Sequence, residues 1–138
     1  MALKIKINNL VKKRKIPVAS VKKAAELVLK KFGKRKASLD ITFVSNRMIE
    51  RLNKRYMGRK KPTDVLAFEL KKKALVGDIY ISSDMAERQS RVYKTNFRNE
   101  IILYTIHGVL HLVGLGDKTK KEKNIMRKLE GKFLERAT

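Results

Sequence analysis

Two histidines, at positions 107 and 111, are the residues of this sequence whose type and spacing point most directly to chemistry. They are the only histidines in the 138-residue chain. On a helix, side chains four residues apart project from one face, so both imidazoles can reach one ion at the distance of about 2.0–2.1 Å typical of zinc–nitrogen bonds. We therefore interpret His107 and His111 as a pair of metal ligands.

A third ligand is expected from the turn that follows this helix. Gly114 and Gly116 flank Leu115, and glycine adopts the positive φ that reverses a chain sharply, so Asp117 can point back toward the imidazoles. Three protein ligands leave one coordination position open, which is typical of a catalytic zinc site. The alternative is that both histidines fill polar niches in the core and that Asp117 is an ordinary turn residue.

The charge balance indicates a polyanionic partner. Lysine and arginine number 35 against 13 aspartates and glutamates, and the formal net charge of +22 is distributed along the whole sequence. Cations that neutralise phosphates release counterions and give strong, salt-dependent binding to nucleic acid. A heat-adapted protein with a highly charged surface is the alternative, but such adaptation raises glutamate together with lysine. A membrane surface is the weaker candidate.

Composition also limits the compartment and the type of site. The chain has no cysteine, which excludes disulfides, disulfide-linked partners and thiolate metal sites. No apolar stretch is long enough to span a membrane, and the first six residues lack the apolar core of a secretory signal. We therefore expect a cytoplasmic protein with no membrane partner. The length and a hydrophobic content of 43% favour a single domain over residues 1–138.

Periodic apolar residues predict the elements that must position these side chains. Alternation predicts strands at 3–7, 39–43, 64–70 and 76–81. Helical stripes and capping residues predict five helices. The first runs from Pro17 to Gly33, the second is capped by Ser45 and carries Ile49, Leu52 and Tyr56 on one face, and the third is capped by Ser82 or Ser83. The fourth runs from Asn96 through Val113, and the fifth has a Thr119/Glu122 capping box and a buried stripe of Ile125, Met126, Leu129 and Phe133.

These elements predict an α+β fold. One small mixed sheet of about four strands would pack with about five helices, and the metal site would lie on the long fourth helix and the turn after it.

The segment 107–117, HGVLHLVGLGD, resembles the H-G-x-L-H-L-x-G-Y-D-H signature of the YbeY family of endoribonucleases. Other motifs match in the same order. Asn53 and Tyr56 resemble the family's N-x-x-Y, the segment 62–68 resembles P-T-D-V-L-S-F, and 77–79 resembles G-D-I. Further matches are Arg98 and Glu100 before the signature and Met126 and Glu130 after it. Several independent motifs in consistent order are more specific than one.

Two positions depart from the family pattern. The family's third histidine falls on Asp117, with Gly116 where its aspartate usually stands, so a carboxylate replaces an imidazole among the ligands. The family's functional arginine, directly after the tyrosine, falls on Met57, which can neither pair with phosphate nor stabilise developing charge. Arg59 is the nearest replacement, and Arg55 is another.

The resemblance implies a metal-dependent endoribonuclease that hydrolyses single-stranded RNA in ribosomal RNA maturation and ribosome quality control, with ribosomal particles as partners. We expect one divalent ion, zinc first, held by His107, His111 and Asp117. Arg59 would complete the catalytic residues by stabilising charge in the transition state. A basic groove would hold the RNA strand, with contributions from Arg55, Arg59, Lys60, Lys61 and Thr63.

Two other interpretations remain open. A zinc peptidase would share the His-x-x-x-His spacing, but such enzymes need glutamate directly after the first histidine as general base, and Gly108 stands there. A non-catalytic basic RNA-binding or ribosome-associated protein would explain the charge with inert histidines. Charge alone does not separate this second alternative from a nuclease.

Overall fold

The sheet has four strands within the residues that the structure describes. This computed structural model describes residues 3–58, 63–71 and 73–138. The strands are β1 (Leu3–Asn9), β2 (Ala37–Val44), β3 (Val65–Lys71) and β4 (Leu75–Ser82), in the spatial order β1-β2-β4-β3. β1, β2 and β4 run parallel because helical segments separate them along the chain, whereas β3 and β4 are antiparallel because a short turn joins them.

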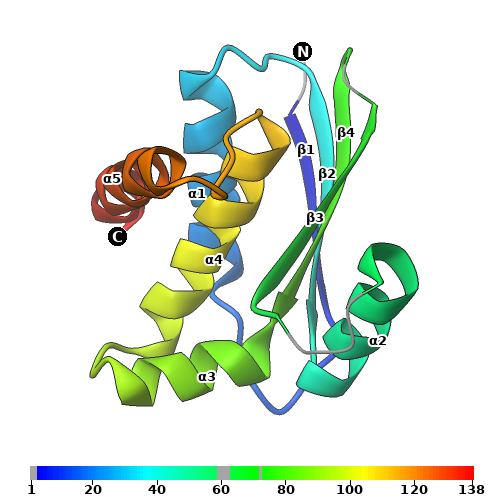
Figure 1. The fold of residues 1–138 in the computed structure, drawn as a ribbon, viewed down its shortest axis with the longest axis vertical. Coiled ribbons are helices and arrows are strands. Elements are labelled where there is room, and N and C mark those ends of the chain that lie inside the picture. Colours follow the sequence, from blue (N-terminus) through cyan, green and yellow to red (C-terminus); the bar gives the residue numbers. More distant parts are fainter. Residues whose placement is uncertain (1–2, 59–62, 72) are drawn as a thin grey trace.

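Five helices accompany this sheet in the described part of the chain. They are α1 (Val18–Lys31), α2 (Asn46–Met57), α3 (Ser83–Val92), α4 (Phe97–Leu112) and α5 (Lys120–Ala137). Figure 1 shows α1 and α4 on one face of the sheet, α5 outside them, and α2 on the opposite side. The predicted α+β fold, with a four-stranded mixed sheet and five helices, is therefore confirmed.

Among the described residues, no helix has both the length and the apolar content that a membrane span requires.

α4 is the central helix of the fold. It contacts α1, α3 and α5, and it lies across β3 and β4. It is therefore buried on most of its circumference, and this explains why its apolar residues form a nearly continuous run instead of one stripe. Ile79 of β4 and Ile106 of α4 are completely buried in the core between sheet and helix.

Two glycines allow α4 to approach the sheet closely. A Cβ atom on Gly108 would lie 2.9 Å from Cγ2 of Ile79, and one on Gly77 of β4 would lie 2.7 Å from Cδ1 of Leu112. Both distances are shorter than side chains tolerate, so glycine is needed on each side of the contact. His107 precedes Gly108 directly, so the first candidate ligand is adjacent to this close contact.

The predicted helix caps are confirmed at four helices. Each capping side chain accepts a hydrogen bond from a backbone N–H in the first turn of its helix, which satisfies one of the free donors there. Of the two candidates before α3, Ser82 is the cap, because its hydroxyl accepts from the N–H of Met85 at 3.0 Å. The four caps are Ser45, Ser82, Asn96 and Thr119, the last forming a complete capping box with Glu122.

Two local predictions are wrong. Ile125 does not belong to the buried stripe of the last helix but is 46% exposed. α5 is the outermost helix, so only a narrow face, which includes Met126, Phe133 and Ala137, reaches the core. Gly116 also does not adopt positive φ, which in this turn belongs to Gly114 alone (φ 107°).

Gly116 instead lies close to a side chain of the next helix. A Cβ atom on it would lie 2.6 Å from a carboxylate oxygen of Glu122, the residue that closes the capping box of α5.

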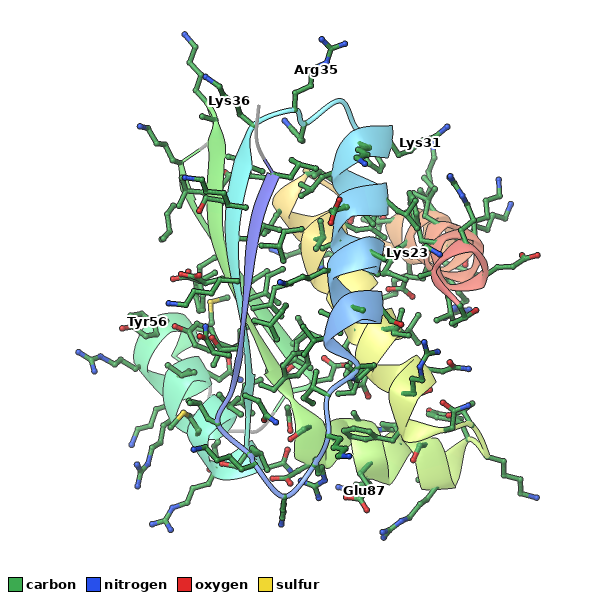
Figure 2. The ribbon with its side chains drawn as sticks, turned by 180° about the vertical axis from the view of Figure 1, so that it is seen from behind. Lys23, Lys31, Arg35, Lys36, Tyr56 and Glu87 are labelled. Carbon is green, nitrogen blue, oxygen red and sulfur yellow. The ribbon has the colours of Figure 1, made fainter. Side chains whose placement is uncertain are left out.

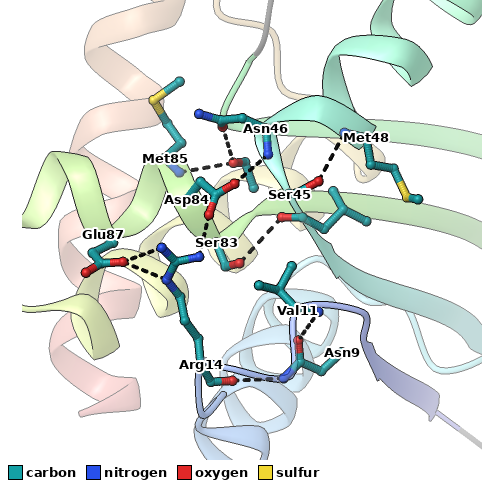
Figure 3. A network of polar contacts seen from close by, with 12 residues as sticks. Asn9, Val11, Arg14, Ser45, Asn46, Met48, Ser83, Asp84, Met85 and Glu87 are labelled. Carbon is teal, nitrogen blue, oxygen red and sulfur yellow. Dashed lines mark hydrogen bonds and ion pairs between the residues drawn. The ribbon is translucent and has the colours of Figure 1, made fainter.

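An ion-pair network joins the loop after β1 to the start of α3 (Figure 3). The guanidinium of Arg14 pairs with the carboxylates of Asp84 and Glu87. Asp84 also accepts a hydrogen bond from the backbone N–H of Asn46 at 2.8 Å, which ties α3 to the first turn of α2. Burial alone would raise the pKa of Asp84, but the bonds from Asn46 and Arg14 outweigh it, so the pKa lies below its ordinary value.

Candidate metal centre

His107 and His111 project from the same face of α4. Their Nε2 atoms are 3.0 Å apart, and the two rings are nearly perpendicular, with an interplanar angle of 80°. The helix brings them together because residues four apart lie one turn above each other. Two nitrogen lone pairs therefore approach a common point.

Asp117 reaches the same point through the turn that follows α4. The positive φ of Gly114 reverses the chain, and the N–H of Leu115 donates back to the carbonyl of Leu110 at 3.0 Å, which closes the helix end. The Oδ2 atom of Asp117 then lies 3.5 Å from Nε2 of His107 and 3.3 Å from Nε2 of His111. The convergence expected from the sequence is thus present in the structure.

Each imidazole is oriented by a second contact through its other nitrogen. Nδ1 of His111 lies 2.9 Å from the carbonyl oxygen of Leu115. A carbonyl only accepts, so Nδ1 carries the proton, and Nε2 presents a free lone pair. Nδ1 of His107 contacts the carboxylate of Glu130 on α5 in the same manner. A partner of this kind fixes the ring and its tautomer in metal sites.

The negative charges around His107 also affect its protonation. Burial lowers the pKa of His107, but the hydrogen bond to Glu130 and the charges of Glu130, Asp64 and Asp117 together raise it above the ordinary value. A site that favours a proton on this ring also favours a metal cation, because both compete for the same nitrogen lone pair.

The three ligand atoms fit a divalent ion. Within the part of the chain that the structure describes, they form the one group of three His, Cys, Asp or Glu side chains close enough to hold an ion together. Nitrogen and carboxylate oxygen donors suit zinc. The side chains are 24%, 30% and 41% exposed in the order His107, His111 and Asp117, so one side of the group stays open to solvent.

Two surface hollows share Asp117 and between them reach both histidines. The first, of about 450 Å³, lies between α4 and α5 and is lined by His107 and Asp117. The second, of about 670 Å³, is lined by His111, Asp117 and residues of α2 and β3. An extended chain could therefore pass from one hollow to the other across the ligand group.

The other residues singled out in the sequence lie at different distances from this group. Thr63 lines the second hollow. Arg55 is on the exposed end of α2, with its guanidinium 5.6 Å from the centroid of the Tyr56 ring, and it lines neither hollow. Arg59, Lys60 and Lys61 lie outside the described residues.

Two partners of the ligands are not evident from the sequence. The carbonyl of Leu115 is a backbone atom, so no side-chain pattern reveals it. Glu130 is 23 residues from His107, and only the packing of α5 on α4 brings the two together. Glu130 matches a family residue that follows the signature, but this match assigns no role to it.

Comparisons with known proteins show the family of the chain. The family model described as "Endoribonuclease YbeY" matches residues 6–138. A protein named "Endoribonuclease YbeY" from Chlorobium phaeovibrioides is 35% identical over 88% of this chain and 83% of its own length. One of the same name from Aquifex aeolicus is 35% identical, with coverage of 89% and 85%.

A solved structure is also similar. The solution structure of TM1509 from Thermotoga maritima matches with a TM-score of 0.68 and 28% identity, covering 96% of this chain and 88% of that one. The family match extends over both histidines, Asp117 and Glu130. The chain therefore belongs to the YbeY endoribonuclease family.

Proposed function

We propose that this chain is a metal-dependent endoribonuclease that cuts single-stranded RNA, with ribosomal RNA as its substrate. Residues 1–138 act as one catalytic domain in the cytoplasm, with ribosomal particles as partners and a role in ribosome quality control. The observation that carries the proposal is the convergence of two Nε2 atoms and one carboxylate oxygen, within 3.5 Å of one another, on an open surface.

His107, His111 and Asp117 hold one divalent ion, and zinc is the first candidate. When bound, this ion supplies Lewis-acid stabilisation of negative charge that develops on the phosphoryl oxygens. Glu130 and the carbonyl of Leu115 keep the two rings in the orientation that binding requires. Asp117 adds a negative charge where the family pattern has a neutral imidazole, which makes the site less electrophilic than three histidines would.

Cations dispersed over the surface hold the RNA backbone. The net charge of +22 gives the whole molecule a field that attracts phosphates. Figure 2 shows Lys31, Arg35 and Lys36 extending into solvent from the end of α1 and the segment that follows it. We assign the RNA contacts nearest the site to Arg55, Arg59, Lys60, Lys61 and Thr63. Arg59 is in addition the proposed catalytic cation.

Metal analysis combined with RNA cleavage tests the proposal. Purified wild-type protein should contain about one zinc per chain and cut an end-labelled, unstructured RNA, whereas His111→Ala should contain none and leave the RNA intact. The exposed α5 variant Glu135→Gln is the matched control and should behave as wild type. Wild-type protein that binds RNA but holds no metal and cuts nothing would favour the non-catalytic RNA-binding alternative.

A peptidase function is disfavoured by the geometry at Gly108. The general-base glutamate of such enzymes would occupy this position, where even a Cβ atom would lie 2.9 Å from Ile79 and 3.2 Å from Val65. The position faces the sheet and not the ligand group, so a side chain there has neither space nor access to a substrate.

A further inference from the structure

The hollow between α4 and α5 is built from more than the metal ligands. On α4 it is lined by Leu103, Tyr104 and His107, which share one helical face. The opposite wall comes from α5, and Tyr93, at the end of α3, stands at its margin. Its volume of about 450 Å³ lies in the range of about 300–1,000 Å³ that small-ligand sites occupy. The α5 wall consists of Lys123, Met126, Arg127 and Glu130.

Tyr104 has a hydroxyl that no residue of the described structure uses. The residue is only 7% exposed, yet within the described ranges it makes no hydrogen bond. Among those residues, every fully enclosed side-chain nitrogen or oxygen has a partner, so the hydroxyl of Tyr104 is not fully enclosed, and Tyr104 lines the hollow. A hydroxyl that solvent reaches and that no protein group uses is available to hydrogen-bond a ligand in the hollow.

The hydroxyl of Tyr104 remains a hydrogen-bond donor at all ordinary pH values. Burial raises the pKa of Tyr104 strongly, and the nearby charges of Asp64 and Glu100 raise it further. This hydroxyl can therefore donate to an acceptor in the hollow, such as a base carbonyl, a ring nitrogen or a sugar oxygen, and its oxygen can also accept.

Tyr93 presents an unoccupied aromatic face. Its side chain is 68% exposed, and within the described part of the chain its ring stacks on no other aromatic ring. Leu103 and Met126 supply an apolar surface, while Lys123 and Arg127 supply positive charge. The lining also includes the carboxylates of Asp64, Asp117 and Glu130. The aromatic face, the apolar floor, the tyrosine hydroxyl and the two cations together match the base, sugar and phosphate of a nucleotide.

We propose that this hollow is a subsite for one unpaired ribonucleotide next to the phosphodiester that is cut. The base stacks on Tyr93 above Leu103 and Met126, the hydroxyl of Tyr104 donates to the base or sugar, and Lys123 and Arg127 pair with the adjacent phosphate. The subsite rests on the proposed nuclease function, since it shares His107 and Asp117 with the candidate metal centre. A paired base cannot leave its duplex to enter the hollow without unstacking, so the subsite selects single strands.

A binding experiment tests the subsite without relying on cleavage. The His111→Ala protein is suitable because His111 does not line this hollow. Its affinity is measured for a hexanucleotide RNA and for six versions in which one base at a time is removed. Loss of the base that occupies the hollow should weaken binding about tenfold.

Addition of Tyr93→Ala decides whether that base lies on Tyr93. It should weaken binding of the intact RNA about tenfold. It should also abolish the loss of affinity caused by the one abasic position, because the ring of Tyr93 is then absent whether or not the RNA carries that base. Tyr104→Phe keeps the ring and removes only the hydroxyl, and it should weaken binding of the intact RNA about fivefold. Arg127→Gln removes a cation that lines the hollow and should weaken RNA binding, whereas the control Lys128→Gln, on the other face of α5, should leave affinity nearly unchanged.

The outcomes separate the subsite from the nuclease. If wild-type protein cuts RNA but every abasic penalty is the same with and without Tyr93→Ala, the subsite is wrong and the nuclease stands. If the Tyr93 coupling is found but wild-type protein cuts no RNA, the subsite is supported as a nucleotide site and the nuclease is wrong. Thermal unfolding of each variant checks that it is folded, and the conservative Tyr104→Phe change provides a second measurement should Tyr93→Ala be destabilised.

Discussion

Glu130 of α5 contacts Nδ1 of His107 of α4, so the last helix orients a ligand of the candidate metal centre that the fourth helix carries. Without this carboxylate the ring of His107 loses a contact that fixes its orientation, and its Nδ1 proton loses a charged acceptor. The same contact encloses one wall of the hollow between the two helices.

Replacement of Glu130 should therefore weaken metal binding. We expect Glu130→Gln to lower zinc affinity about tenfold, the lower end of what outer partners of metal ligands contribute. Competition with a chromophoric chelator measures the affinity. Glu135→Gln, on an exposed position of the same helix, should bind zinc as wild type does, and equal affinities for the two variants would contradict the role of Glu130.

Removal of the carboxylate ligand should separate metal binding from RNA binding. Asp117→Ala is expected to lose zinc affinity by more than the roughly 100-fold that an outer partner contributes, and with it RNA cleavage. RNA affinity should change little, because it comes from cations dispersed over the surface. Elemental analysis and a filter-binding titration provide the two measurements. Normal cleavage by Asp117→Ala would refute its assignment as a ligand.

RNA affinity should decrease steeply as salt increases. The logarithm of the binding constant is expected to fall linearly with the logarithm of salt concentration, with a slope of about −0.7 for each phosphate contacted on a single strand. A strand held through about four phosphates would lose about fiftyfold in affinity between about 50 and 200 mM salt. The slope should be the same for Asp117→Ala. Constant affinity over this range would argue against a surface that binds phosphates.

Stability should decrease in acid through Asp84. Because its folded-state pKa is depressed, the carboxylate stabilises the fold above its unfolded pKa, and this stabilisation is lost as pH falls through the folded value. Asp84→Asn should cost about 2 kcal/mol in free energy of unfolding at pH 7 and less at pH 3. Urea unfolding at both pH values tests this.

The control for Asp84→Asn is Glu26→Gln. Glu26 forms an exposed pair with Lys30 at 3.9 Å, which should contribute less than about 1 kcal/mol. A similar loss for both variants, or a loss at Asp84 that does not depend on pH, would show that the charge of Asp84 is not what stabilises this junction.

Replacement of two helical glycines by alanine should have opposite effects on stability. Gly108→Ala should destabilise the protein by about 1–3 kcal/mol, because the added methyl group overlaps Ile79. Gly131, inside α5, has no atom within 4 Å of the position of an added Cβ, so Gly131→Ala should stabilise by about 0.5–1 kcal/mol. Thermal unfolding measures both. Equal effects would mean that space at Gly108 is not the constraint.

Features that depend on neighbouring residues could be predicted from the sequence. The strands follow from alternation, and caps such as Asn96 and Thr119 follow from residue type and spacing. The pairing of His107 with His111 also follows, because helical geometry alone places them together. Asp117 could be included because the intervening turn is short.

Features that depend on packing between distant elements could not be predicted. Glu130 reaches His107 only because α5 folds back on α4, and nothing in its local sequence indicates this. Tyr104 lies in an apolar run and looks like an ordinary core residue until the hollow beside it is known. The exposure of Ile125 is a related case, since helical periodicity gives the faces of a helix but not the width of the face that is covered.

The turn that carries Asp117 determines how an ion would enter and leave. Opening of the enclosed helix α4 requires a large part of the core to separate, so the imidazoles are displaced only in rare fluctuations. The carboxylate lies on a surface segment between two helices, where local opening costs far less. Ion exchange should therefore begin with the departure of Asp117, and the rate of metal release would report the motion of this short turn while the protein remains folded.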